Sequence, residues 1–435
     1  MNSTTNIDSG VPDAEAPAAP APVRGALFDV FRHRNYRLYF FGQGISLVGF
    51  WMQAIAQSWL VYKLTGSPLL LGLVSFAQQA PVFFISPFAG VVADRANRRR
   101  ILFVTQIAMM TFACILALLT LTGVVHVWHI IVLASLFGIA NSFDIPTRQS
   151  FTVEMVGRSD LPRAIALNSV MFNGARLVGP TIAGVVVGLV GEGWCFALNG
   201  VSYIAVIGGL ALMTVTVPPP RPPSHPLTDL REGFRYVATH PSIRLLLLVL
   251  AGSSFFGASY LTLMPVFARD ILHGGPDAYG FLMAGVGGGA LIGALTLSRL
   301  PHSWLPYIPF AAAVWFGVFL IAFSQSTVFP LSVLLLMPAG FGLMAQGIST
   351  NTLIQTLVVD EMRGRVMAYY VMCFMGILPF GALTAGWVSH SIGVPETVAL
   401  GGALCMVSGA IAYLVFRNGL KPSASLRVLA EKTGD

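Results

Sequence analysis

The sequence predicts an all-α membrane protein with twelve transmembrane helices in two six-helix, pseudo-symmetric halves. Of its 435 residues, 55% are hydrophobic and only 10% are charged, and the mean hydropathy is +0.75. A spanning helix needs about 20 apolar residues, so twelve would take roughly 260 and leave too few for a separate catalytic domain. The basic residues, which give a net charge of +7, are dispersed between apolar runs, and this excludes nucleic-acid binding.

Twelve apolar segments are long enough to cross a bilayer. Six fall in the first half, at 37–63, 68–92, 101–123, 128–149, 165–190 and 194–216. Six more follow at 243–268, 277–299, 304–324, 329–356, 365–390 and 395–417. They divide the chain into a disordered cytoplasmic N-terminal tail (1–35), a first bundle (36–216), a cytoplasmic linker (217–242), a second bundle (243–417) and a cytoplasmic C-terminal tail (418–435).

The distribution of Lys and Arg predicts the orientation, because positively charged loops stay in the cytoplasm. Of the 25 basic residues, 22 lie in the tails or in the loops on the same side as the tails. Lys63 and Arg269 lie on the opposite side, and Arg176 lies inside a span. We therefore expect a multi-pass protein of the cytoplasmic (inner) membrane with both termini in the cytoplasm.

The linker between the halves begins with five prolines in residues 217–223, which cannot continue a helix. From Pro226 onward, apolar residues recur at helical spacing, while Arg231 and Arg235 lie one turn apart on another face. This pattern predicts a short surface helix. The helix is either a strut against lipid or a docking site for a partner.

Glycines in spans 5 and 11 indicate that the two halves are repeats. Gly179 and Gly184 match Gly381 and Gly386 at one offset of 202 residues. Transporters built from repeats bind their substrate between the repeats, near the midplane of the bilayer. We therefore expect a cargo site between the two bundles.

The loop between spans 2 and 3 carries the most specific motif, Gly90-Val-Val-Ala-Asp94-Arg95-Ala-Asn-Arg98-Arg99-Arg100. Gly90 lets another helix approach closely, Asp94 can accept from a helix N-terminus, and the arginines face lipid phosphates. Together with twelve spans, this motif resembles the major facilitator superfamily. The resemblance implies that the halves alternate access to a central site, and that this loop locks the outward-open state without touching cargo.

Further stretches resemble one branch of that superfamily, the drug and siderophore exporters related to the enterobactin exporter and the macrolide efflux proteins. The resemblance covers residues 30–417. It rests on the segments 143–149, 167–169, 230–237 and 362–367, together with Arg176, Gly179-Pro180 and His240-Pro241. Substrates in this branch range widely, so the resemblance implies export without selecting the cargo.

Asp144 lies in the cytoplasmic third of span 4, where an unpaired carboxylate would be costly. Arg148 follows at i+4, and Arg98 comes from the loop. In the family, the positions of Asp94, Arg98 and Asp144 form a charge relay, so the resemblance implies a pair between Arg98 and Asp144. A proton-carrying role and plain packing are the alternatives for Asp144. The predicted conformational relay comprises Gly90, Asp94, Arg95, Arg98, Asp144 and Arg148.

Arg176 is the deepest basic residue, roughly 16 Å along span 5 at 1.5 Å per residue. An arginine at that depth faces protein or a water-filled cavity, and by default it marks a functional site. Its guanidinium suits an anionic or catecholate-like cargo. The alternative is a buried structural partner.

Amide side chains are the other candidates for the cargo cavity. Gln53 and Gln57 share one face of span 1, and Asn141, Asn168 and Asn173 lie in spans 4 and 5. Each either lines the cavity or joins helices by hydrogen bonds. Span 1 has no carboxylate, so its composition does not reveal which group would couple transport to protons.

Gly179, Pro180 and Gly184 in span 5 resemble in part a signature of antiporting members of the superfamily. Independently of the resemblance, the proline is expected to bend the helix, and the glycines are expected to permit tight contacts between helices. The alternative is a bent packing helix with no link to export.

The sequence contains no HExxH motif, Asp-rich metal pair, Ser/His dyad or GxxxxGK[ST] loop, and its four cysteines have no metal-ligand spacing. We expect no enzyme activity, no metal and no cofactor, with a proton gradient as the driving force. The expected partners are a small-molecule substrate and the lipid bilayer, and the expected state is a monomer.

These features predict a secondary active transporter that exports a drug-like compound or a siderophore by proton antiport. The alternatives are a solute uptake symporter, a lysophospholipid flippase and a non-transporting membrane sensor.

Overall fold

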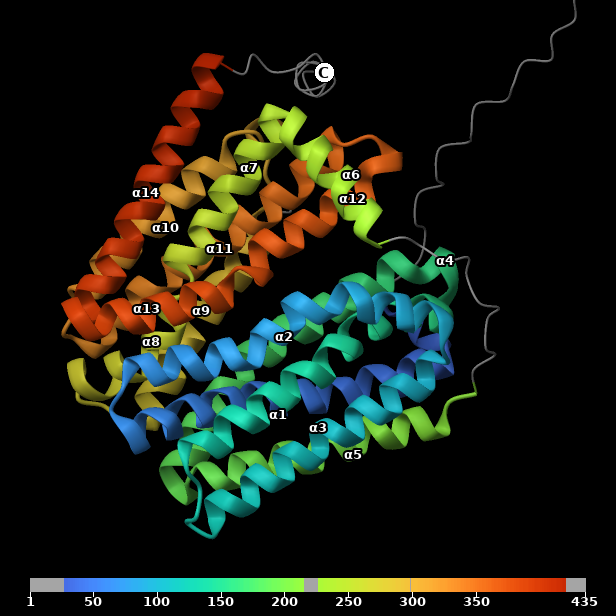
Figure 1. Cartoon of the computed structure of the whole chain (residues 1–435), viewed down its shortest axis with the longest axis vertical. Helices are drawn as coiled ribbons and strands as arrows, with labels where there is room; N and C mark the ends of the chain where they lie inside the picture. Colours follow the sequence, from blue (N-terminus) through green and yellow to red (C-terminus); the bar gives the residue numbers. More distant parts are fainter. Residues whose placement is uncertain (1–26, 215–225, 298, 420–435) are drawn as a thin grey trace, which may run out of the picture.

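The computed structural model describes residues 27–214, 226–297 and 299–419, and nearly all of them are helical (Figure 1). Eleven stretches are long and apolar enough to cross a membrane, and the shorter apolar helix Ile308–Ser324 brings the number to twelve. The predicted all-helical fold with twelve spans is confirmed. Within the described ranges, no strand accompanies the helices.

The first bundle builds six spans from five helices. They are α1 (Arg34–Thr65), α2 (Pro68–Arg95), α3 (Arg98–Leu121), α4 (Val127–Val190) and α5 (Glu192–Leu212). Ser67 caps α2 by accepting from the Leu70 N–H at 3.4 Å, and Pro68 fits the first turn, where its missing N–H is not needed. Asn97 caps α3 by accepting a hydrogen bond from the next turn.

Spans 4 and 5, which the sequence places at 128–149 and 165–190, are the two arms of α4, Val127–Gly157 and Ser159–Val190, separated by a break at Gly157. Helix persists beyond residue 149 because Phe151 and Val156 are buried against the first bundle. The chain turns back at Gly157, where φ is +72°, a conformation that glycine tolerates because it lacks a Cβ.

The second bundle contains two spans that are interrupted by π-helical turns. Span 7 runs through α7 (Pro241–Gly252), η2 (Ser253–Gly257), α8 (Tyr260–Val266) and η3 (Phe267–Ile271). Span 11 runs through α12 (Asp360–Val371), η5 (Met372–Gly376) and α13 (Leu378–Ile392). The other elements are α9 (Pro276–Leu297), the 3-10 turn η4 (His302–Trp304), α10 (Ile308–Ser324), α11 (Phe329–Leu357) and α14 (Val394–Gly419).

Part of the segment 1–35, which the sequence predicts to be a disordered tail, is helical. A 3-10 helix, η1 (Leu27–Arg32), precedes α1. Val30 is fully buried, and Phe31 packs edge to face on Phe40 with ring centroids 5.0 Å apart. This apolar burial offsets the entropy lost on ordering the segment.

The helix α6 (Pro226–Thr239) lies at the position of the predicted surface helix and packs on α12. The Glu232 carboxylate accepts from Arg365 Nη1 at 2.5 Å, and the Tyr369 hydroxyl donates to the Leu230 carbonyl at 2.8 Å. Phe234 remains 62% exposed. The proline-rich part of the linker lies outside the described residues.

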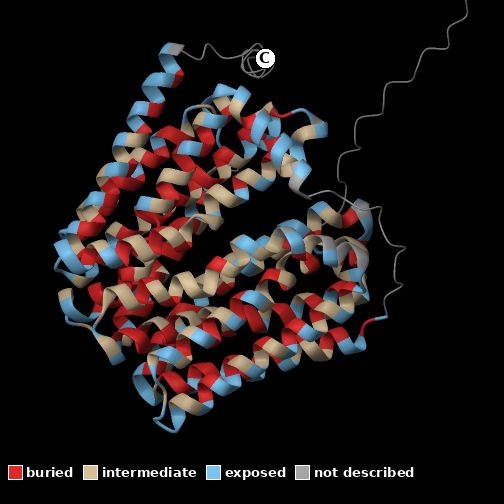
Figure 2. Cartoon of the chain, in the orientation of Figure 1, coloured by how far each residue is buried: buried red, intermediate tan, exposed pale blue. Residues whose placement is uncertain are grey.

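The two bundles lie close together near one end of the molecule and diverge toward the other (Figure 1). We call the end that holds η1, α6 and the last turn of α14 the termini end. The opposite end, with the turns at Gly66, Gly191 and Gly393, is the far end. Figure 2 shows mainly intermediate and exposed residues along α2, where it borders the second bundle.

Glycines bring α2 and α13 together at the far end. A Cβ on Gly72 would lie 2.5 Å from the Ala382 carbonyl oxygen, and one on Gly386 would lie 2.6 Å from the Pro68 carbonyl oxygen. Real Cβ atoms do not approach so closely, so these helices touch backbone to backbone.

The pair formed by α4 and α9 repeats this arrangement. A Cβ on Gly280 would lie 2.6 Å from the Pro180 carbonyl oxygen, and one on Gly184 would lie 2.9 Å from the Pro276 carbonyl oxygen. Each pair joins one helix of each bundle. We call the two pairs together the far-end seam.

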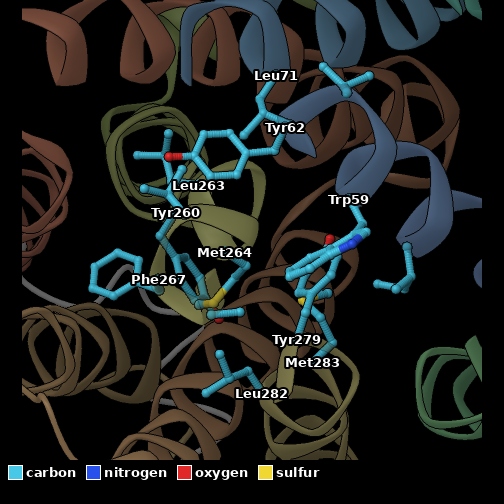
Figure 3. Close-up of a cluster of buried hydrophobic side chains, with 14 of the residues drawn as sticks. Trp59, Tyr62, Leu71, Tyr260, Leu263, Met264, Phe267, Tyr279, Leu282 and Met283 are labelled. Carbon is cyan, nitrogen blue, oxygen red and sulfur yellow. The ribbon is translucent and has the colours of Figure 1, made fainter. Parts of the chain in front are cut away.

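Aromatic side chains add further contacts between the bundles at this end (Figure 3). Trp59 of α1 stacks on Tyr279 of α9 with ring centroids 6.4 Å apart. The Tyr62 hydroxyl of α1 donates to the Asp270 carboxylate of η3. Packed glycines and buried aromatic rings therefore hold the bundles together at the far end.

Candidate cargo site and charge network

Arg176 lies near the middle of the span Ser159–Val190, on the side of α4 that faces other helices. Its guanidinium carbon lies 5.8 Å from the centroid of the Trp51 ring in α1, a cation–π arrangement. The backbone of Arg176 packs on α9, where a Cβ on Gly287 would lie 3.5 Å from the Arg176 carbonyl oxygen. The side chain is partly exposed and, among the described residues, makes no hydrogen bond or ion pair.

The neighbouring residues of span 5 explain this close packing. A Cβ on Gly179 would lie 2.5 Å from the Trp51 Cβ, so the glycine lets α1 approach α4. Pro180 has no N–H, so it cannot satisfy the Arg176 carbonyl four residues earlier. The backbone dihedral angles stay helical at Pro180, and the interior break of α4 lies at Gly157 instead.

The two glutamines of α1 join helices. Gln53 is 8% exposed and accepts from Nδ2 of Asn199 in α5 at 2.7 Å. Gln57 is 6% exposed and donates from Nε2 to Oε1 of Gln78 in α2 at 3.3 Å. Of the two alternatives for these side chains, the structure therefore supports hydrogen bonding between helices. Their placement at the cargo cavity stays a prediction.

The three asparagines occupy different surroundings. Asn168 accepts from the Tyr36 hydroxyl at 3.0 Å, which ties α4 to α1. Asn173 donates to the Ser169 carbonyl of its own helix at 2.9 Å, one turn before Arg176. Asn141 is half-buried in α4. Asn141 and Asn173 stay candidates for the cavity wall, whereas Asn168 serves a helix contact.

Asp144 is fully buried and receives three donors. It forms the ion pair with Arg148 that the i+4 spacing predicts. The Thr105 hydroxyl donates to the same carboxylate at 3.0 Å, and Gln106 Nε2 donates at 2.8 Å. This network ties α3 to α4 and satisfies a charge that would otherwise be costly to bury.

Arg98 pairs with Glu154, so the expected pair between Arg98 and Asp144 is wrong. The side chains are 8% and 14% exposed, respectively. Glu154 can reach Arg98 because α4 continues as a helix to Gly157 instead of ending at residue 149. Among the described side chains, the predicted relay contains two ion pairs, Arg98 with Glu154 and Arg148 with Asp144.

The remainder of the loop motif is less defined. The α2 backbone continues to Arg95, but the side chains of Asp94 and Arg95 lie outside the described residues. A Cβ on Gly90 would have no described atom within 4 Å. Among the described residues, no helix therefore approaches Gly90 closely, at the end where the bundles diverge (Figure 1).

The profile of the transmembrane secretion effector family, a branch of the major facilitator superfamily, matches residues 26–426. The chain belongs to this family. The transporter is 25% identical to the staphyloferrin A transporter of Staphylococcus aureus over 390 residues, which cover 87% of this chain and 96% of that protein. It is 26% identical to the enterobactin exporter of Shigella boydii over 340 residues, which cover 77% and 80% of the two chains.

The transporter also resembles a crystal structure of a bacterial homologue of the human lysosomal transporter Spinster in an inward-facing, occupied conformation. The TM-score is 0.69 at 16% identity, and the match covers 90% of this chain and 99% of that one. This likeness shows the fold. Family membership makes the protein a multi-pass membrane transporter and not an enzyme.

Sequence reasoning did not find the polar contacts of the transporter's far end. Lys63 Nζ donates to Glu192 Oε1 at 3.0 Å, and the Arg269 guanidinium carbon lies 5.7 Å from the Tyr62 ring centroid. Lys63 and Arg269 are the two basic residues at the end opposite the tails. Their isolation from the other basic residues is the sequence feature that could have indicated these contacts. Each has an acid within reach, Glu192 for Lys63 and Asp270 beside Tyr62.

Proposed function

We propose that the transporter is a secondary active exporter of a siderophore-type small organic molecule. The observation that carries this proposal is Arg176, a guanidinium in mid-span whose neighbour is the Trp51 ring. A charge at that depth is costly and marks a functional site by default. Siderophores bind iron through anionic oxygens, which a planar guanidinium recognises well. The relatives named for staphyloferrin A and enterobactin support this cargo class.

We place the transporter in the cytoplasmic membrane with both termini in the cytoplasm, on the basis of its basic residues. In that orientation the far-end seam closes the outer side, and the conformation is inward-facing. Rocking of the bundles about a central site would alternate access. Cargo from the cytoplasm would reach Arg176 in this state, as export requires.

A proton gradient would drive the exchange, with Asp144 as the group that binds the proton. Its carboxylate is fully buried and holds Arg148, Thr105 and Gln106. Protonation would weaken this network and loosen α3 from α4, which gives a route from a proton to a helix movement. The transporter acts as a monomer in the bilayer and needs no cofactor in this scheme.

A strain in which the gene is deleted tests the direction of transport. Cells that make a siderophore should accumulate it internally and release less into the medium, and the restored gene should reverse both changes. A lower internal content in the deletion strain would identify an importer. Unchanged contents on both sides would rule out the siderophore that these cells make as cargo.

A further inference from the structure

A groove on the outer face of the first bundle lies between α3 and the first arm of α4. Its volume is about 700 Å³, within the range of roughly 300–1,000 Å³ that ligand sites occupy. Figure 1 shows α3 on the side of the first bundle away from the second bundle, and α3 packs on α4 and α5. Val104, Leu136 and Ile139 line the groove and are exposed. The groove therefore opens toward lipid and not toward the space between the bundles.

The lining of the groove is polar at one end and apolar along most of its length. Asn97 and Arg100 lie at the termini end, where the span Arg98–Leu121 begins. From Arg100 to Phe112 the groove follows α3 for about 18 Å, at 1.5 Å per residue. Half of the hydrocarbon core of a bilayer is about 15 Å thick. The apolar part of the groove therefore has the length of the acyl chains in one leaflet.

Three consecutive arginines begin α3, and two of them have partners within the protein. Arg98 pairs with Glu154, and Arg99 donates from Nε to the Leu210 carbonyl at 2.8 Å. Arg100 is exposed, and among the described residues its side chain makes no hydrogen bond or ion pair. Its guanidinium is therefore available to an anion at the polar end of the groove. The N-terminal end of α3 adds positive potential at the same place.

The groove also borders the network around Asp144. Thr105 lines the groove, and its hydroxyl donates to the Asp144 carboxylate at 3.0 Å. Phe143, another lining residue, directly precedes Asp144 in α4. A molecule in the groove would contact both α3 and α4 and would cover this side of the network. Exclusion of water strengthens the electrostatic interactions of such a network.

We propose that this groove binds an anionic phospholipid, with an acyl chain between α3 and α4 and the headgroup phosphate on Arg100. An apolar channel as long as one leaflet, which ends at an available guanidinium, is complementary to such a lipid in shape and charge. Arginine can bind phosphate through paired hydrogen bonds. A zwitterionic headgroup would bring an ammonium group into the same positive region, so the charge favours an anionic one. The bound lipid ties α3 to α4 and keeps water from the Asp144 carboxylate.

Native mass spectrometry of the purified, full-length transporter in detergent tests the proposal, because it resolves each bound lipid by its mass. The probes are phosphatidylglycerol and phosphatidylcholine with identical acyl chains, and glycerol 3-phosphate as a headgroup without chains. Phosphatidylglycerol should bind roughly fivefold more tightly than phosphatidylcholine, the factor that one basic residue contributes at a membrane surface. Equal affinities for the two phospholipids would overturn the proposal. Glycerol 3-phosphate that binds as tightly as phosphatidylglycerol would also overturn it, because the acyl chain would then contribute nothing.

Arg100→Gln tests the headgroup contact. It should weaken the binding of the first phosphatidylglycerol roughly fivefold and leave phosphatidylcholine unchanged. Arg37→Gln is the matched control, because it removes the same charge from an exposed arginine of α1 that lies outside the groove. Both arginines are exposed, so neither substitution should lower the melting temperature without lipid. Equal losses of phosphatidylglycerol binding in the two variants would assign the effect to general surface charge and overturn the proposal.

Ala108→Phe tests the position of the acyl chain by placing a ring in the groove. It should weaken both phospholipids at least about threefold, because the chain loses its packing against α3 and α4. Ala410→Phe is the control, because Ala410 lies exposed in α14 between the exposed residues Val407 and Ile411. It should leave binding unchanged. An Ala108→Phe protein that melts with the parent and binds phosphatidylglycerol as tightly would overturn the proposal, and the pair of arginine variants tests the site if Ala108→Phe does not fold.

Discussion

The Tyr62 hydroxyl in α1 donates a hydrogen bond to the Asp270 carboxylate in η3, and this bond joins the two bundles at the far end. The Arg269 guanidinium lies over the same tyrosine ring. Separation of the bundles at this end must break both contacts. The side chain of Asp270 is 51% exposed, so water moderates the strength of the bond.

Tyr62→Phe should shift the transporter toward the state that is open at the far end. Loss of one partly exposed hydrogen bond to a carboxylate is worth about 1 kcal/mol, or roughly a fivefold change in the ratio of states. Pulsed electron paramagnetic resonance between spin labels at Leu64 and Val328, which lie exposed in different bundles, should show more of the longer distance. A distribution that matches the parent would show that the bond does not hold the far end closed.

Gly184→Ala should open the far-end seam, whereas Gly188→Ala, one turn further along α4, should not. A Cβ on Gly184 would lie 2.9 Å from the Pro276 carbonyl oxygen, but one on Gly188 would have no neighbour within 4 Å. The misfit should cost the closed state about 1–3 kcal/mol. The spin labels at Leu64 and Val328 measure the change. Identical distances between the labels in Gly184→Ala and Gly188→Ala would contradict the role of the seam in closing the far end.

The split of the charge network predicts which residues are energetically coupled. A double-mutant cycle of Arg98→Ala with Glu154→Ala should give a coupling energy of about 1–3 kcal/mol for unfolding in detergent. The cycle of Arg98→Ala with Asp144→Asn should give less than about 0.5 kcal/mol. A larger coupling energy for Arg98 with Asp144 than for Arg98 with Glu154 would contradict this account and support the pair that the resemblance implied.

Asp144→Asn should abolish transport driven by a pH gradient. Exchange of labelled cargo across a membrane without a pH gradient should continue. The amide cannot take part in proton binding, but it can still accept from Thr105 and Gln106. Glu154→Gln is the control, because it removes the nearby carboxylate that pairs with Arg98, and it should keep transport coupled to pH. Equal loss of both activities in Asp144→Asn would assign Asp144 a structural role.

The spans and the Arg148–Asp144 pair could be predicted because their causes are local. Bilayer thickness requires about 20 apolar residues in a row, and a separation of four residues places two side chains on one helix face. The pair between Arg98 and Glu154 was missed because it depends on α4 continuing beyond residue 149. That continuation depends on burial of Phe151 and Val156, which is a tertiary effect.

The surroundings of the cargo site depend on contacts between distant segments. The depth of Arg176 follows from its position in the span, but its contact with the Trp51 ring requires the packing of α1 against α4. Gln53 and Gln57 were ambiguous because periodicity shows that they share a face, not which helix covers it. The matched glycines of spans 5 and 11 were a better guide to the contacts between the bundles than the glutamines were. Gly184 and Gly386 occupy equivalent positions in the seam.

Uptake into inside-out membrane vesicles tests the central claim of proton-driven export most directly. Vesicles that contain the transporter and have an acidic interior should take up a radiolabelled, iron-free siderophore against its gradient. Uptake should stop when the pH gradient is collapsed, and Arg176→Ala should reduce it at the same amount of protein. Gradient-driven uptake into right-side-out vesicles, with none into inside-out vesicles, would contradict export.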